Sequence, residues 1–178
     1  MILVALETSS FVAGIAVTDE DRVLVESSLQ VGTVYAEQLP VMLERALNDA
    51  DVPFDQVDGF AVSIGPGSYT GLRVGLSLAK GLAFTAGKPL VAVPTLDTIA
   101  LCSSFSKYPV QAVLDAGRQK IYTAGYDTSS GEPERRTPYQ ATTLDSLMDS
   151  VTEPVVFAGP GASKYQTTIT QALGNNAL

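Results

Sequence analysis

The hydrophobic residues at the start of the chain fall in three short runs separated by polar residues. The continuous apolar run over 2–6 predicts a strand buried on both faces, and the runs over 12–18 and 23–29 predict two more strands. The polar stretches between them, 7–10 and 19–21, are short, so the three strands are expected to form antiparallel hairpins.

After these strands the spacing of hydrophobic residues becomes helical. Apolar residues on one face predict a helix over 37–50, with Pro40 in its first turn, where a missing N–H is tolerated. The elements expected next are a strand over 60–64, a helix that follows Gly-Pro-Gly and ends before Gly87, a strand over 90–93 and a helix over 95–101. This order of elements is typical of a mixed sheet of the ribonuclease H-like kind.

The helix before Gly87 is apolar on nearly all sides. Small residues recur every four positions and form a smooth stripe, at Gly71, Gly75, Ala79 and Ala83. Leucines lie beside the stripe, at 72, 76, 78 and 82, and the polar side chains of Arg73, Ser77 and Lys80 share one narrow sector. Such a helix must be covered on more than one side, so a sheet can cover one face while something else covers another.

The second half of the chain echoes the first. Strands over 112–115 and 121–124 flank a turn led by Asp115, as the first two strands flank a turn led by Glu7. A polar loop over 127–138, a short helix near 144–148, a strand over 155–158 and a helix over 163–173 complete the pattern. We interpret the echo as a duplicated half-domain, although strand, acid, turn, strand is a common order. The expected lobes are 1–104 and 105–178.

Composition narrows the chemistry available to the protein. The net charge of -8 and pI of about 4.4 disfavour direct binding of a nucleic acid backbone. The single cysteine, Cys102, excludes an intrachain disulfide and suits the cytoplasm. The chain has no histidine, which excludes Ser-His-Asp and Cys-His catalysis and every zinc site that uses histidine. Neither a signal peptide nor a membrane-spanning helix is indicated, because Glu7, Arg73 and Lys80 interrupt the apolar stretches.

Two kinds of turn are candidates for binding phosphate. The loop over 65–71 lies between a strand and a helix, but it lacks the P-loop lysine, and Thr70 stands where a dinucleotide motif needs its third glycine. A tight turn with close helix packing is the favoured interpretation, and an anion at the helix N-terminus is the alternative. The two acid-led turns could hold nucleotide phosphates with a metal, or could simply be good hairpin turns. The residues concerned are Thr8, Ser9, Ser10, Asp115 and Arg118.

Several stretches occur together in the order typical of one family. The most specific is Ile64–Gly75, IGPGSYTGLRVG, and Glu7–Ser9, Ala36–Pro40 and Leu114–Ala116 with Tyr122 accompany it. Across essentially its whole length the chain resembles the bacterial TsaB (YeaZ) family, which takes part in making threonylcarbamoyladenosine beside the tRNA anticodon.

The resemblance implies an α/β fold of the actin-like ATPase (ribonuclease H-like) class, with two lobes. It implies a non-catalytic subunit that activates a TsaD-type catalytic subunit, with a TsaE-type ATPase in the assembly and a homodimer when isolated. No cofactor is required by this subunit itself, ATP or ADP is expected at an interface of the complex, and tRNA contact is left to the partner.

The first two helices are expected to form the partner surface. The residues that this expectation assigns to it are Tyr35, Glu37, Leu39, Met42, Leu43, Leu72, Arg73, Leu76 and Lys80.

Three departures from the family pattern stand out. Glu7 replaces the usual aspartate, and Tyr35-Ala36-Glu37 replaces a usual His-Ser-Glu. Members normally run some tens of residues longer, so the second lobe is expected to be incomplete. The lack of histidine rules out the metal-dependent glycoprotease label given to the wider family. The main alternative is an ATP-dependent small-molecule kinase or ATPase of the actin-like superfamily, and a purely structural homodimer is a third.

Overall fold

A computed structural model describes residues 1–20, 22–30 and 35–178. The chain divides into two compact units, Met1–Thr95 and Leu96–Leu178. The division falls before the expected 104/105 boundary, because Leu96 and Ala100 of helix α3 (Thr95–Leu101) are fully buried in the core of the second unit. A helix that follows the last strand of one unit thus packs as part of the next.

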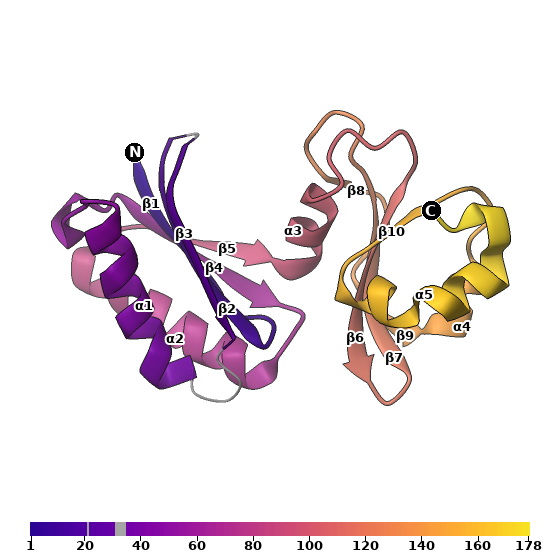
Figure 1. Ribbon diagram of the computed structural model, residues 1–178, viewed down its shortest axis with the longest axis horizontal. Helices are drawn as coiled ribbons and strands as arrows, with labels where there is room; N and C mark the ends of the chain where they lie inside the picture. Colours follow the sequence, from indigo (N-terminus) through magenta and orange to yellow (C-terminus); the bar gives the residue numbers. More distant parts are fainter. Residues whose placement is uncertain (21, 31–34) are drawn as a thin grey trace. The chain divides into compact units, whose positions relative to one another are not determined.

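The first unit is a five-stranded sheet in the order β3-β2-β1-β4-β5, with helices α1 and α2 on one face (Figure 1). The strands β1, β2 and β3 are antiparallel, whereas β4 and β5 run parallel to β1. The elements are β1 (Ile2–Glu7), β2 (Val12–Asp19), β3 (Arg22–Gln30), α1 (Tyr35–Asp49), the short helix η1 (Phe54–Gln56), β4 (Gly59–Gly65), α2 (Tyr69–Ala86) and β5 (Leu90–Pro94). The predicted order of elements is confirmed.

The two faces of this sheet are buried to different degrees. Val4 and Leu6 of β1 lie in the core beneath α1 and α2, whereas Leu3 and Ala5, on the opposite face, are half-buried. The expectation that β1 is buried on both faces is therefore only half right, since the two long helices of this unit cover the same side.

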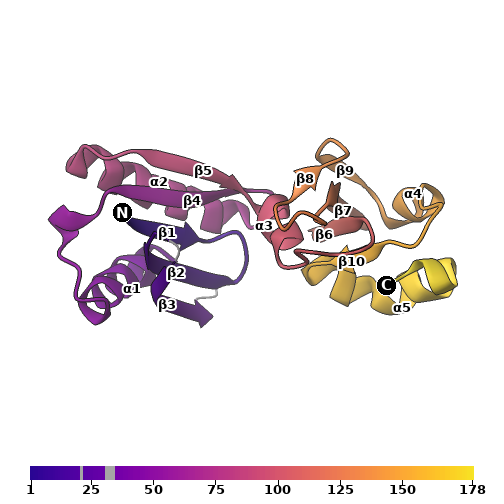
Figure 2. The ribbon, with the colours of Figure 1, turned by 90° about the horizontal axis from the view of Figure 1, so that it is seen from above.

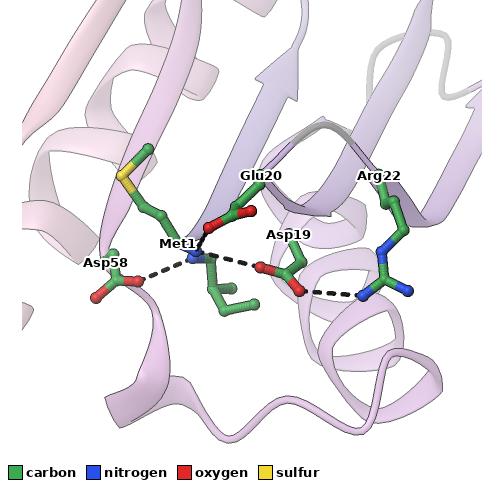
Figure 3. A network of polar contacts seen from close by, with 6 residues as sticks. Met1, Asp19, Glu20, Arg22 and Asp58 are labelled. Carbon is green, nitrogen blue, oxygen red and sulfur yellow. Dashed lines mark hydrogen bonds and ion pairs between the residues drawn. The ribbon is translucent and has the colours of Figure 1, made fainter.

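A network of charged groups fixes the start of β1 (Figure 3). The Met1 ammonium lies 3.2 Å from an Asp19 carboxylate oxygen, which is the main reason that the pKa of this ammonium is raised. Arg22 also pairs with Asp19, at 3.2 Å, and the Ile2 amide donates to Asp58 Oδ2 at 2.8 Å. These contacts join β1 to the β2–β3 turn and to the loop before β4.

Helix α2 lies directly on the sheet, alongside β4 (Figure 2). Its small-residue stripe, Gly71, Gly75, Ala79 and Ala83, is buried, as predicted. The approach is very close at Gly75, where a Cβ atom would lie 2.2 Å from Thr8 Oγ1. The helix begins at Ser68, whose hydroxyl accepts from the Gly71 amide, and ends at Gly87, which has a left-handed φ of 63°.

The second unit repeats the connectivity of the first. Its sheet runs β10-β6-β7-β8, and β9 also pairs with β7. The elements are β6 (Val110–Gly117), β7 (Lys120–Asp127), β8 (Glu134–Arg135), β9 (Gln140–Thr143), α4 (Leu144–Asp149), β10 (Val156–Ala158), α5 (Pro160–Leu173) and η2 (Gly174–Asn176). Helix α3 covers one face of the sheet, and α4 and α5 lie on the other.

Three features support a duplicated half-domain. The order β9-β7-β6-β10 matches β3-β2-β1-β4, with the same strand directions. Gly-Pro-Gly follows the last of these strands in both units, and its first glycine has φ 99° at Gly65 and 102° at Gly159. Val155 forms a parallel bridge with Ala177, at the position that β5 takes beside β4.

The packing at Gly75 gives a direct test. We expect Gly75→Ala to destabilise the protein by about 1–3 kcal/mol, because the added methyl group overlaps Thr8 on a rigid strand end. Denaturant unfolding measures the change. Gly81→Ala, in the same helix, is the matched control: its Cβ meets nothing within 4 Å, so this substitution should stabilise by roughly 0.5–1 kcal/mol. Equal effects of the two substitutions would contradict the proposed role of the stripe.

Candidate functional site

The backbone amides of the first acid-led turn form hydrogen bonds within the chain. Thr8 is fully buried and Ser9 is 8% exposed. The Thr8 amide donates to Ser63 Oγ at 3.1 Å, and the Ser9 amide donates to Glu7 Oε1 at 2.5 Å. Thr8 Oγ1 has no hydrogen-bond partner among the described residues, but it faces the backbone of α2 at Gly75. Of the three predicted residues in this turn, Ser10 is the one that is exposed.

The glycine loop before α2 covers this turn. The Ser68 amide donates to the Ser9 carbonyl oxygen at 2.6 Å, and a Cβ atom at Gly67 would lie 2.3 Å from the same oxygen. This loop therefore packs its backbone against β1–β2, which agrees with the tight-turn interpretation. The Ser68 amide is therefore unavailable to an anion.

The second acid-led turn is held by helix α5. Asp115 accepts from Tyr165 Oη at 2.8 Å and from the Gly117 amide at 3.2 Å, and it forms an ion pair with Lys164. The hydrogen bond from Lys164 is the main reason that the pKa of Asp115 is lowered. Arg118 is exposed at the tip of the turn and, with Asp115 and Lys164, lines a groove of about 540 Å³.

Glu7 and Asp115 do not occupy equivalent places, which corrects the expectation from the sequence. Glu7 follows Leu6, whose side chain lies beneath α1 and α2, so Glu7 points to the other face of its sheet, opposite Gly14. Asp115 shares a face with Val113, which packs under α5. Asp115 thus points to the face of its sheet that carries α5, whereas Glu7 points away from α1 and α2. The similar spacing in the sequence does not show this difference in side-chain direction.

We expect the lowered pKa of Asp115 to depend on Lys164. In Lys164→Met the pKa of this carboxyl should rise toward its usual 3.8, because the ion pair and its hydrogen bond are lost. Carboxyl chemical shifts followed by NMR during an acid titration measure this. Lys120→Met, in the same hairpin, is the control and should leave the Asp115 pKa unchanged.

The sign of the coupling to stability follows from the lowered pKa. The Asp115–Lys164 pair stabilises the fold at pH values above the carboxyl's usual pKa, and this contribution is lost as the pH falls through the lowered value. If the stability of the wild-type protein and that of the Lys164→Met variant fell in the same way as the pH is lowered, the assignment would be contradicted.

The surface formed by helices α1 and α2 is different in character. A groove of about 570 Å³ runs between the helices, with apolar walls and few charges. Its lining residues are Ala36, Leu39, Pro40, Thr70, Arg73, Val74, Ser77 and Leu78. We call this groove and the exposed side chains of both helices the α1–α2 surface.

The predicted interface residues are distributed unevenly across this surface. Glu37, Arg73 and Lys80 are exposed, and Leu72 and Leu76 are half-buried. Leu39, Met42 and Leu43 all lie in the core of the unit itself, so none of them offers a partner an appreciable surface, although Leu39 lies behind the groove wall. Their helical spacing marked the face that packs on the sheet. The side chain of Tyr35 lies outside the described residues.

Three exposed hydrophobic residues of these helices were not singled out from the sequence. Phe84 is 88% exposed, Tyr69 73% and Val41 40%. Tyr69 is held under the Arg73 guanidinium, 5.4 Å from its ring centre. Phe84 follows Lys80 by four positions on α2, and this spacing could have shown that the two share a face.

Among residues 1–20, 22–30 and 35–178, no cluster of three or more histidine, cysteine, aspartate or glutamate side chains could hold a metal ion. No helix in these ranges is long and apolar enough to cross a membrane.

Comparison with known proteins gives the family. Residues 31–172 match the family model described as TsaD, tRNA N6-adenosine threonylcarbamoyltransferase. The TsaB protein of Bacillus subtilis, named a tRNA threonylcarbamoyladenosine biosynthesis protein, is 32% identical over all of this chain and 79% of its own length. The chain belongs to the TsaB family of tRNA threonylcarbamoyladenosine biosynthesis proteins.

Other relatives refine the picture of this TsaB-family chain. A tRNA N6-adenosine threonylcarbamoyltransferase of Geobacter is 35% identical over 62% of this chain and 37% of its own. The solved structure of YeaZ from Pseudomonas aeruginosa superposes with a TM-score of 0.80 at 26% identity, covering 93% of this chain and 78% of that one. A type IV pilus PilM–PilN complex, at 9% identity and a TM-score of 0.52, shares only the fold. The predicted two-lobed α/β fold is confirmed.

Proposed function

We propose that this TsaB-family chain is a non-catalytic subunit in tRNA threonylcarbamoyladenosine biosynthesis, which binds and activates a TsaD-type catalytic subunit through the α1–α2 surface. The observation that carries the proposal is the contrast between two regions. The turns that would hold a nucleotide are engaged in contacts within the chain, whereas the α1–α2 surface exposes a groove and large apolar side chains.

The actin-like fold raises the question of a bound magnesium nucleotide, and the residues fit one poorly. Thr8 and Ser9 are buried, and the carboxylate of Asp115 is already paired with Lys164. The proposal therefore assigns no cofactor to this subunit and leaves ATP or ADP to an interface of the complex. An ATP-dependent kinase or ATPase, which would need these same groups free, has less support.

The charges on the two helices favour a partner built on the same plan. Helix α2 carries Arg73 and Lys80 and no acidic residue, whereas α1 is net acidic through Glu37, Glu44 and Asp49, opposed by Arg45. When one helix pair packs on a related pair, each α1 can lie on the other's α2, which matches opposite charges. In this proposal a TsaD-type paralogue takes this place in the complex, and a second copy takes it in an isolated homodimer.

The acidic charge of this chain is the reason that the proposal gives tRNA contact to another subunit. With a net charge of -8, the chain is a poor ligand for the tRNA backbone, so tRNA contact belongs to the catalytic subunit in this proposal. A TsaE-type ATPase completes the assembly, in the cytoplasm where tRNA is modified.

Reconstitution tests the proposed function. Transfer RNA, threonylcarbamoyl-adenylate and the catalytic subunit are combined with and without this chain, and modified adenosine is measured. The modification is expected only when the chain is present. Equal modification without it, or transfer by this chain alone, would overturn the proposal, and ATP turnover by the isolated chain that Asp115→Ala abolishes would favour the kinase alternative.

Two variants test whether this stimulation of tRNA modification depends on the α1–α2 surface. In the same assay Phe84→Glu should lower the stimulation about tenfold or more at limiting subunit concentration, because an unpaired charge would enter an apolar interface. Thr167→Glu, at an exposed position of α5 outside the α1–α2 surface, is the control. Neither substitution touches the core, so an unchanged melting temperature confirms that both variants are folded.

A further inference from the structure

A third groove, which the proposed function does not use, lies within the second unit. It has a volume of about 680 Å³ and opens on the face of the sheet that carries α4. Its walls come from β6, β7, β9, the end of α4 and residues 151–155. This volume is in the range of sites that enclose a small molecule.

Comparison of the two units explains why the groove exists. Helix α1 has 15 residues, whereas α4, at the corresponding point of the second unit, has 6. Under the long helix the paired strand residues Val4 and Val17 are apolar and fully buried. Near the end of the short helix the corresponding face carries Gln111 and Thr123. The short helix thus leaves part of the face open, and polar side chains occupy that part.

The floor of this groove is formed by polar side chains that are hydrogen-bonded to one another and to the sheet. Gln111 Nε2 donates to Thr123 Oγ1 at 2.6 Å, and the Thr123 hydroxyl donates to the Ala112 carbonyl at 2.7 Å. Thr123 is only 2% exposed, so this pair is fixed from below. The Gln111 amide keeps one N–H and its carbonyl oxygen for another partner. Next to it, Gly125 adds no side chain, and its amide donates to Thr137 Oγ1 at 2.7 Å.

The Asp127 and Arg136 charges at the rim are satisfied within the protein. Asp127 accepts from the Ser129 amide and hydroxyl and pairs with Arg136 at 2.7 Å. These contacts, led by the hydrogen bond from the Ser129 hydroxyl, lower the pKa of Asp127 to about 2, so the pair stays ionised at neutral pH. Glu153 is the other charged residue of the lining. The groove therefore offers mainly neutral hydroxyl and amide groups to a ligand.

We propose that this groove binds a neutral, hydroxyl-rich small molecule of the sugar class. Hydroxyl and amide side chains both donate and accept, as the hydroxyl groups of a sugar do. Among the described lining residues an anion finds no unpaired cation, and Glu153, which has no ion pair there, is exposed, where a single carboxylate holds a cation only weakly. The groups that would serve are Gln111, Thr137, Gln140, Thr142, Ser146 and Thr152. The proposal is independent of the α1–α2 surface, which belongs to the other unit.

NMR of the labelled full chain tests the proposal, with D-ribose and D-glucose as probes and acetate and methylammonium as charged comparisons. At millimolar concentrations a neutral sugar should shift the amide signals of Gly125 and Thr142 in a saturable way, and the charged compounds should not. Gln111→Leu and Thr142→Val should each weaken sugar binding about fivefold, the effect expected from losing one hydrogen bond.

Thr167→Val, an exposed threonine of α5 outside the groove, is the control and should bind as the wild type does. Thr142→Val keeps the shape of its side chain, so it provides a folded variant even if Gln111→Leu disturbs the floor. The absence of saturable shifts with either sugar, shifts that map elsewhere, or equal shifts with acetate would each overturn the proposal.

Discussion

The contact between Gly75 of α2 and Thr8 at the end of β1 sets the geometry on which the first unit depends. Because no side chain stands between them, the helix lies directly on the strand end and the Gly-Pro-Gly loop folds over the β1–β2 turn. This same approach buries Thr8 and Ser9. It also fixes the orientation of the outer side of α2, with Arg73, Lys80 and Phe84, so packing on one side of the helix determines what the other side can bind.

The duplicated half-domain shows how one connectivity produces two different surfaces. In the first unit a long α1 pairs with a nearly apolar α2 and leaves a groove between helices. In the second unit a short α4 leaves a polar groove over the sheet, and Lys164 and Tyr165 of α5 bind Asp115. The topology is shared, and helix length and the polarity of a few sheet positions account for the difference.

The sequence predicted the parts of this protein that rest on strong periodicity. The stripe of α2 follows from the four-residue spacing over 71–83, and the order of elements in the first unit follows from the apolar runs and helical spacing over 2–101. Side-chain periodicity also marked Met42 and Leu43, but a helix that packs on its own sheet shows the same apolar spacing as one that binds a partner. The polar loop expected over 127–138 contains the short strand β8, and β9 is equally polar. Both strands are held by pairing with β7 rather than by burial of their own side chains, so no apolar pattern marks them. The position of α3 in the second core depends on contacts between segments distant in sequence, which no local pattern reports.

The central claim is that this protein acts through the α1–α2 surface and not through its acid-led turns. Hydrogen exchange of the chain, measured alone and with the TsaD-type catalytic subunit, tests it most directly because it locates the contact without a substitution. The account predicts slowed exchange in peptides from α1 and α2, including those over residues 36–49 and 69–86, with the turns at 7–10 and 115–119 unchanged. Protection confined to those turns, with α1 and α2 unaffected, would contradict it.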